Sequence, residues 1–407
     1  MRIKCIQCKG RDPSNCGRTY CPILSKISAQ RKVNLSAKQD FFGKSPNVFV
    51  GRFGYPDINV GFLSVEDYQD HDNPLLWSRE GYSIDQVIGL RSSLINSSFK
   101  SNIKSFNDRL IAMGQEIGMA KDPVDTEINL SKKPSFSLSF AQDVMPHGPN
   151  IKLKKARITE NAKVPRAVDK AVSDTDLKAG QALGDLYKKD DIDEHYLTRL
   201  LSVGNLGVKG QRKLVPTRWS VTSVDSTLGK QFIDEVKDYQ PHDFAVFFGG
   251  HLGNYYLALF FPEMWSYELF ETYVGKSTWH DSDGISVSTD YEPYDGRKGY
   301  AFETAGGYYA ARLPVLEYLR KRRRQSSVLL LRFITGEYYA PLGVWVVREA
   351  VRKTLASKPL LFADKELMLK YAKALVKKKF NVNADLFLSN SKMLNQMKSQ
   401  VKLHRFF

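Results

Sequence analysis

The sequence predicts an α+β (mixed α/β) protein without a standard superfold, with a small cysteine-rich module at the N-terminus and a peptide tail at the C-terminus. Three observations predict this organisation. All four cysteines lie in the first 21 residues, strand-like and helical patterns alternate through the body, and apolar density falls after residue 380. A chain of 407 residues that is 42% hydrophobic can bury a substantial core. We expect a module over 1–30, a core over 31–380 with two subdomains dividing near 165–215, and a basic tail over 381–407.

The first half of the body shows local patterns typical of one hairpin and three helices. Residues 47–63 alternate β-branched and aromatic side chains around Gly-Tyr-Pro-Asp, which predicts a β-hairpin. A Ser cap and helical spacing predict a helix over 83–95. Residues 120–165 read as a long irregular connection. Further helices are expected over 173–189, with Ser173 as cap, and over 193–204.

The second half carries the densest apolar patterns. Residues 244–262 contain two strand-like runs joined by a Gly-rich turn, and 286–293 is a further strand candidate. Residues 306–334 read as a helix with a basic end followed by a buried strand. Amphipathic helices are expected over 341–355 and 364–380. We expect the residues after 380 to form a partly ordered tail that presents the chain end.

Cys5, Cys8, Cys16 and Cys21 form the pattern C-x2-C, seven residues, C-x4-C. Two short cysteine pairs joined by a turn-forming segment are typical of a closed tetrahedral Zn²⁺ site. A segment this short has no core of its own, so the metal would supply its folding energy. Disulfides are the alternative, but no secretion signal indicates an oxidising compartment. We therefore expect structural Zn²⁺ as the cofactor.

Positive charge gathers at the two ends of the chain. The net charge is +16, and residues 1–40 hold nine Lys/Arg against two Asp/Glu, while 365–407 hold ten against two. Basic ends around a nearly neutral body favour a polyanion partner, most plausibly nucleic acid, over lysines that only solvate the surface. The basic side chains around the cysteines suit phosphate contacts. These candidates are Lys4, Lys9, Arg11 and Arg18.

A second basic cluster lies at 319–327 and includes Arg322, Arg323 and Arg324. These arginines are further candidates for phosphate contacts. The alternative is a helix C-terminus that favours cations through its dipole.

Catalytic motifs are scarce. The sequence contains no G-x-x-x-x-G-K-[ST], no G-x-S-x-G and no H-E-x-x-H. Asp290 and Glu292 alternate on the expected strand and should share one face. With Glu303 they could hold a divalent cation for phosphodiester cleavage, as in a metal-dependent, nuclease-like enzyme. The alternative, which we favour, is that they form buried ion pairs with nearby arginines or a solvated edge.

The chain ends on two phenylalanines, and Gln400, Leu403, Phe406 and Phe407 fit the pattern Q-x-x-L-x-x-F-F. In a short helical turn the three apolar side chains project to one side, with the amide ahead of them. Clustered aromatic anchors are typical of protein-binding hot spots. The pattern resembles the box by which replication and repair proteins bind the ring-shaped sliding clamp (PCNA). The alternative is a tail that folds back onto its own core.

Nearly the full length of the chain resembles the archaeal Nre DNA-repair family. The stretches "NVFVGRFGYPDINVG", "LVPTRWSVTSVD", "GGYYAARLPVLEYL", "RRQSSVLLLR" and "PLGVWVVREAVR" carry the resemblance, together with the cysteine cluster and the terminal box. The resemblance implies DNA-damage repair linked to the sliding clamp, with a zinc-finger-like N-terminus in some members. It implies no catalytic mechanism.

We therefore expect a DNA-repair factor that binds DNA and is tethered to the clamp. A metal-dependent enzyme acting on damaged DNA and a zinc-bearing RNA-binding protein are the alternatives. The sequence has neither an apolar signal region nor a run of eighteen apolar residues. We expect a cytoplasmic, nucleoid-associated protein without a membrane partner.

Overall fold

The computed structural model describes residues 38–135, 147–189, 191–274 and 285–399, together with Cys21 and Leu24. The chain divides into two compact units. The N-terminal unit comprises Cys21–Leu228 and Ala340–Leu342, and the described C-terminal unit runs from Gly229 to Ser399 apart from those three residues. The division falls inside helix α9 (Thr217–Val236), beyond the 165–215 region expected from sequence, because one continuous helix belongs to both units.

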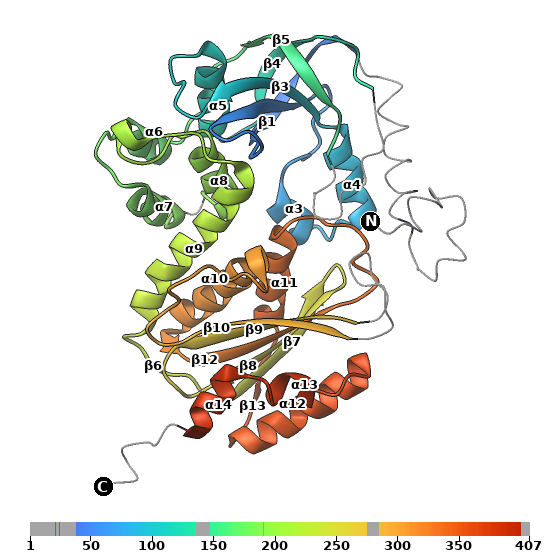
Figure 1. The fold of residues 1–407 in the computed structure, drawn as a ribbon, viewed down its shortest axis with the longest axis vertical. Helices are drawn as coiled ribbons and strands as arrows, with labels where there is room; N and C mark the ends of the chain where they lie inside the picture. Colours follow the sequence, from blue (N-terminus) through green and yellow to red (C-terminus); the bar gives the residue numbers. More distant parts are fainter. Residues whose placement is uncertain are drawn as a thin grey trace. The chain divides into compact units, whose positions relative to one another are not determined.

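The N-terminal unit is built on a closed five-stranded barrel in the order β1-β2-β3-β5-β4, with β4 pairing back to β1 (Figure 1). The β3–β5 pair is parallel and the other pairs are antiparallel. This order, with helix α5 (Arg109–Met119) between β3 and β4, is that of the oligonucleotide-binding (OB) barrel. The expectation of no standard superfold is therefore wrong for this unit. The strands are β1 Asp40–Val50, β2 Asp57–Val65, β3 Ile95–Asn102, β4 Val124–Leu130 and β5 Asn150–Ile158.

The barrel closes around alternating inward side chains. Its core includes Val48 and Phe62 from the strands and Ile111 and Ile117 from α5, all buried. The hairpin predicted over 47–63 is confirmed as β1 and β2.

The irregular connection expected over 120–165 is wrong, since this region holds β4 and β5. In β4 every second side chain from Val124 to Leu130 is buried. In β5 the exposed Lys152 and Lys154 alternate with the buried Ile151 and Leu153. The charged residues of the outer face make the alternating apolar positions hard to recognise in the sequence, where the neighbouring strands of the barrel are not known.

Helices complete the N-terminal unit. The helix expected over 83–95 is confirmed as α4, where Ser83 and Gln86 form a capping box. Ser173 does not cap the following helix as expected, because it is the last residue of α6, and α7 begins after Lys178. The remaining elements are α3 Pro74–Arg79, α4 Ile84–Ser93, α6 Arg166–Ser173, α7 Ala179–Tyr187, α8 Glu194–Ser202 and the 3-10 turn η2 Lys209–Gln211.

The C-terminal unit contains a six-stranded sheet in the order β10-β9-β12-β8-β7-β13. A separate two-stranded parallel sheet is formed by β6 (Gln240–Pro241) and β11 (Arg324–Gln325). Within the sheet β12 runs parallel to β9, and the other pairs are antiparallel. The sheet strands are β7 Ala245–His251, β8 Asn254–Phe261, β9 Ser266–Tyr273, β10 Ser286–Glu292, β12 Ser327–Ile334 and β13 Leu360–Leu361. The strands predicted over 244–262 and 286–293 are confirmed.

Helices cover both faces of this sheet (Figure 1). On one face α11 packs against β7 and β8, and α10 packs against α11. Gly249 permits the close approach of β7 to α11, since a Cβ there would lie 2.9 Å from the Thr354 Cα. On the other face β7, β8, β9 and β12 share one apolar core with α12, α13 and α14. The helices are α10 Ala305–Arg322, α11 Trp345–Ala356, α12 Lys365–Phe380, α13 Asp385–Leu388 and α14 Lys392–Ser399.

Two short helices lie in the segment expected to be a partly ordered tail. Phe387 and Leu388 of α13 and Met393 and Leu394 of α14 are buried in the sheet core. The described part of the expected tail is therefore anchored to the sheet. None of the helices in the described ranges combines the length and apolar character that a membrane crossing needs.

Candidate functional site

Two of the predicted sites fall mostly outside the described residues. Cys5, Cys8 and Cys16, the neighbouring basic side chains and the whole terminal box lie outside, and Cys21 is described as half-buried. Within the described ranges no group of three or more His, Cys, Asp or Glu side chains could hold a metal ion. Three of the four expected ligands are not among the residues searched, so structural zinc stays a prediction.

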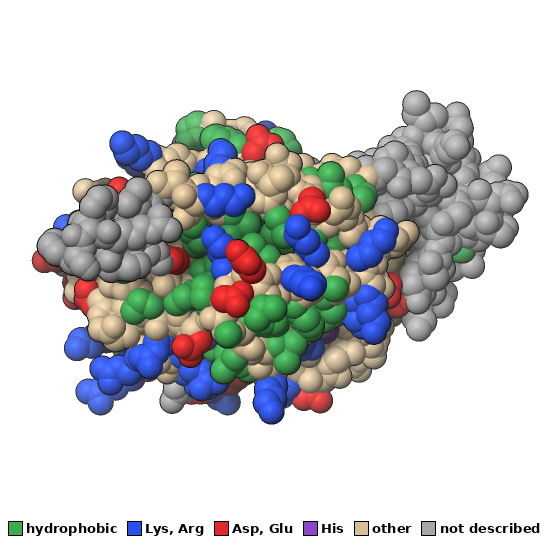
Figure 2. Space-filling view, turned by 90° about the horizontal axis from the view of Figure 1, so that it is seen from below, with side chains coloured by type: hydrophobic (Ala, Val, Ile, Leu, Met, Phe, Trp, Pro, Cys, Tyr) green, Lys and Arg blue, Asp and Glu red, His purple; other side chains and the backbone are tan. Residues whose placement is uncertain are grey.

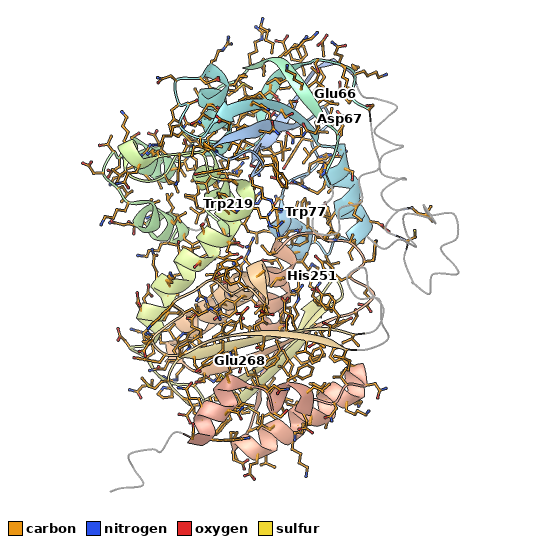
Figure 3. The ribbon with its side chains drawn as sticks, viewed as in Figure 1. Glu66, Asp67, Trp77, Trp219, His251 and Glu268 are labelled. Atoms are coloured by element: carbon orange, nitrogen blue, oxygen red, sulfur yellow. The ribbon has the colours of Figure 1, made fainter. Side chains whose placement is uncertain are left out.

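The described residues show what holds α14, the helix that precedes the box in the sequence. Glu268 projects from β9 towards the start of α14 (Figure 3). Its buried carboxylate accepts hydrogen bonds from the Lys392 and Met393 backbone N–H groups, at 2.9 and 3.1 Å, and from the Ser391 hydroxyl. These amides belong to the first turn of α14. The N–H groups of a first helical turn have no acceptor within the helix itself. The carboxylate therefore caps α14 from a neighbouring strand.

Burial raises the pKa of Glu268, while the hydrogen bonds from Ser391 and the two amides oppose that shift. A second polar contact joins the same elements, because the Tyr291 hydroxyl of β10 donates to Gln396 of α14. Ser399 is the last described residue of α14, and Gln400 is the first residue of the box in the sequence. The first residue of the box thus follows directly on a helix that is docked to the sheet.

The surface around α14 is basic with an apolar floor. A cavity of about 420 Å³ lies between α12, α13 and α14, and its lining includes Leu369, Leu388 and Leu394. Figure 2 looks onto this face and shows hydrophobic side chains with Lys and Arg side chains around them. The lysines of the cavity rim are Lys365, Lys370, Lys373 and Lys398. Glu366 and Asp385 also line the cavity, and Asp385 pairs with Lys373 at 2.7 Å, so the rim carries four lysines against two carboxylates.

The predicted basic cluster lies at the C-terminal end of α10. Arg322, Arg323 and Arg324 are all exposed, and none forms an ion pair within the described part of the chain. Arg323 adopts φ +52° and ends the helix, and the Arg322 guanidinium lies 5.6 Å from the centre of the Tyr318 ring. The arrangement leaves three solvated cations on one turn. It suits phosphate contacts and also complements the helix dipole.

The catalytic candidates are placed in ion pairs. Asp290 and Glu292 share a face of β10, as the period of two predicts, and both are buried. Asp290 pairs with Arg297 at 2.9 Å and accepts from Thr304, whereas Glu292 pairs with Arg312 and accepts from Tyr308 at 3.1 Å. Glu303 is exposed and does not join them. The two buried carboxylates are thus neutralised by arginines, as in the favoured alternative.

The sequence reasoning missed a buried polar cluster in the N-terminal unit. Asp72 accepts hydrogen bonds from Asn47 at 2.6 Å, from Arg91 and from the His195 Nε2 at 2.9 Å. Burial would raise the pKa of Asp72, but His195 and Arg91 hold it well below its usual range. The four residues are far apart in sequence, so no local pattern could have found them. The cluster ties β1, α4 and α8 together.

Comparison with known proteins gives a consistent picture. The family described as "Archaeal Nre, N-terminal" matches residues 15–280, and "Archaeal Nre, C-terminal" matches residues 292–406. The chain is 38% identical to DNA repair protein NreA of Archaeoglobus fulgidus over 89% of this chain and 91% of that protein. It is 35% identical to DNA repair protein NreB of the same organism, over 97% of each. DNA repair protein NreA of Haloferax volcanii is 38% identical over 76% of each chain. No solved structure matches.

Proposed function

The chain belongs to the archaeal Nre family of DNA-repair proteins, and from that premise we propose that it is a DNA-binding repair factor held at the sliding clamp by its C-terminal Q-x-x-L-x-x-F-F box. The observation that carries the proposal is the junction at residues 399 and 400. A helix capped by Glu268 and packed on the sheet is described up to Ser399, and the box follows from Gln400 in the sequence. A short binding peptide that follows a docked helix stays close to the body that it tethers.

Tethering explains why intrinsic affinity for DNA need not be high. A partner linked to a ring on DNA experiences an effective DNA concentration of roughly millimolar order when the linker is short. The clusters around residues 4–18 and 322–324 would supply phosphate contacts. The four-thiol donor set of Cys5, Cys8, Cys16 and Cys21 fits structural Zn²⁺, which would fold the segment that carries the first of these clusters.

The test is a titration of the full chain with the sliding clamp. Phe406→Ala/Phe407→Ala should lower clamp affinity at least about 30-fold, since two buried aromatic anchors are removed. The melting temperature should not change, because the proposal assigns both rings to the partner and not to the chain's own core. His404→Ala is the matched control, as position 404 is one of the variable positions of the box, and it should bind the clamp like the wild type. Equal clamp affinities for all three proteins would contradict the proposal.

A further inference from the structure

The β1–β2 turn of the barrel exposes an unusual number of aromatic rings. Phe49 is 43% exposed, Phe53 78% and Tyr55 42%, and Trp219 at the start of α9 is 44% exposed. The Tyr55 and Trp219 ring centres lie 5.4 Å apart, and the Arg52 guanidinium lies 5.0 Å from the centre of the Phe53 ring. Single exposed rings are ordinary, but four exposed rings on and beside one turn, two of them in contact with each other and a third beside a cation, indicate a binding surface.

The turn holds these rings on a defined backbone. The Gly51 N–H donates to the Asn59 carbonyl at 2.7 Å, and the Asp57 N–H donates to the Gly54 carbonyl at 2.8 Å. Gly54 has φ +82°, and a Cβ there would lie 2.7 Å from the Asp57 carbonyl oxygen. Only glycine suits that position. Phe53 and Tyr55 therefore project from a tight, hydrogen-bonded turn, which lowers the entropy cost of binding through them.

The strand register extends this surface across four strands. Phe49 pairs with Gly61, Gly61 with Ser98, and Ser98 with Lys152, which places one outward row on β1, β2, β3 and β5. Neighbouring strands are about 4.8 Å apart, so the row is roughly 14 Å long. The strip between the aromatic ring at one end and the lysine at the other is polar, because the Asn96 side chain covers Gly61: a Cβ there would lie 1.8 Å from the Asn96 Oδ1.

Cations flank this strip. Lys100 pairs with Asn59 in the adjacent outward row, and Lys154 follows Lys152 on the outer face of β5. All three lysines and Arg52 are exposed, and within the described ranges none of them forms an ion pair. One carboxylate, Asp57, lies at the same edge and accepts a hydrogen bond from Asn102 at 2.9 Å. The charge of the surface is therefore positive.

We infer that this surface, formed by the outward row from Phe49 to Lys152, by the lysines beside it and by the β1–β2 turn, binds single-stranded DNA. The inference rests on the proposed function and names the site and the form of the DNA. In OB barrels the strand 2–3 face and the turn between strands 1 and 2 carry oligonucleotides. Unpaired bases stack on aromatic rings while a basic groove follows the backbone. A duplex keeps its bases stacked and would leave the four rings without partners.

The experiment measures fluorescence anisotropy of a labelled single-stranded 12-mer, the corresponding duplex and the corresponding RNA with the full chain. Single-stranded DNA should bind most tightly. Phe53→Ala/Tyr55→Ala should weaken that binding by roughly 30-fold or more, because two stacking platforms are lost. Phe42→Ala is the matched control, since Phe42 is also an exposed ring on β1 (65% exposed) but pairs with Glu127 of β4. It should bind like the wild type.

A second variant keeps the test informative if the aromatic substitutions disturb the fold. Lys100→Gln/Lys152→Gln should reduce the slope of log K against log salt by about 1.4, since each lysine contributes about 0.7 for a single strand. Tighter binding of duplex or RNA, or equal affinity of the Phe53/Tyr55 and Phe42 variants, would overturn the inference. The chain with Phe406→Ala/Phe407→Ala should retain single-strand binding. A wild-type chain that binds no DNA would instead refute the DNA part of the proposed function.

Discussion

At the scale of single residues, buried charges in both units are balanced by donors from distant parts of the chain. Asp72 is the clearest case, with Asn47, Arg91 and His195 around one carboxylate whose side chain is only 4% exposed. An unpaired charge at such a position would be costly, and removal of one partner leaves the other uncompensated. These residues therefore hold β1, α4 and α8 of the N-terminal unit together.

Replacement of Asp72 by Asn should destabilise this unit by about 3 kcal/mol, because the half-buried Arg91 then lacks a counter-charge. Urea unfolding followed by fluorescence measures the change as a lower midpoint at constant m. The pKa of Asp72 is lowered in the folded state. Its contribution is therefore present above the ordinary carboxyl pKa of about 3.9 and is lost as the pH falls below it, so wild type and variant should converge in acid.

The control for this experiment is Asp57→Asn, an exposed carboxylate at the start of β2. It should change the unfolding free energy by no more than about 0.5 kcal/mol. If Asp72→Asn were as mild as the control at neutral pH, the cluster would have no role in stability.

At the scale of elements, α14 is the last described helix, and it packs against the sheet of the C-terminal unit. An eight-residue helix is too short to be stable alone. Its stability comes from Met393 and Leu394 in the core and from the carboxylate of Glu268 at its first turn.

Glu268→Ala should therefore expose both the Lys392 and the Met393 amide to exchange, whereas Glu268→Gln should keep the protection of only one of them, because the two amides donate to different carboxylate oxygens and Gln retains a single acceptor oxygen. Hydrogen exchange followed by mass spectrometry on peptides that cover residues 389–399 measures the difference. Glu303→Ala, which removes an exposed carboxylate, is the control and should leave exchange unchanged. Equal protection in the Ala and Gln variants would show that Glu268 does not cap α14.

At the scale of the whole molecule, the charge excess lies at the two ends of the chain, and the basic C-terminal end begins within the C-terminal unit, at α12. The proposed zinc module precedes the first described strand, and the clamp box follows the last described helix. The proposed binding functions at the ends are therefore separable by mutation from the cores of the units.

The zinc proposal predicts about one Zn²⁺ per chain by elemental analysis, and its loss in Cys5→Ser/Cys8→Ser. The variant should bind DNA more weakly, because the segment that carries Lys4, Lys9, Arg11 and Arg18 no longer folds around the metal. Unfolding of the two described units should be unaffected. A zinc-free wild-type chain with full DNA affinity would exclude the module.

Local signals allowed several elements to be predicted from the sequence. The Gly-Tyr-Pro-Asp turn marks the β1–β2 hairpin, and the Ser83 capping box marks the start of α4. Such features depend on residues that are neighbours in the chain. The alternation in β10 likewise places Asp290 and Glu292 on one face. The four cysteines and the terminal box are also legible from spacing alone, which is why their chemistry can be proposed without coordinates.

Only the tertiary structure decided what those residues meet. Arg297 and Arg312 neutralise the β10 carboxylates, and Lys-rich β5 becomes a barrel strand because β3 and β4 pair with it. The row from Phe49 to Lys152 exists only once four strands are in register. The free energies of burial and pairing depend on partners brought together from distant positions, and that information is not contained in any local window of the sequence.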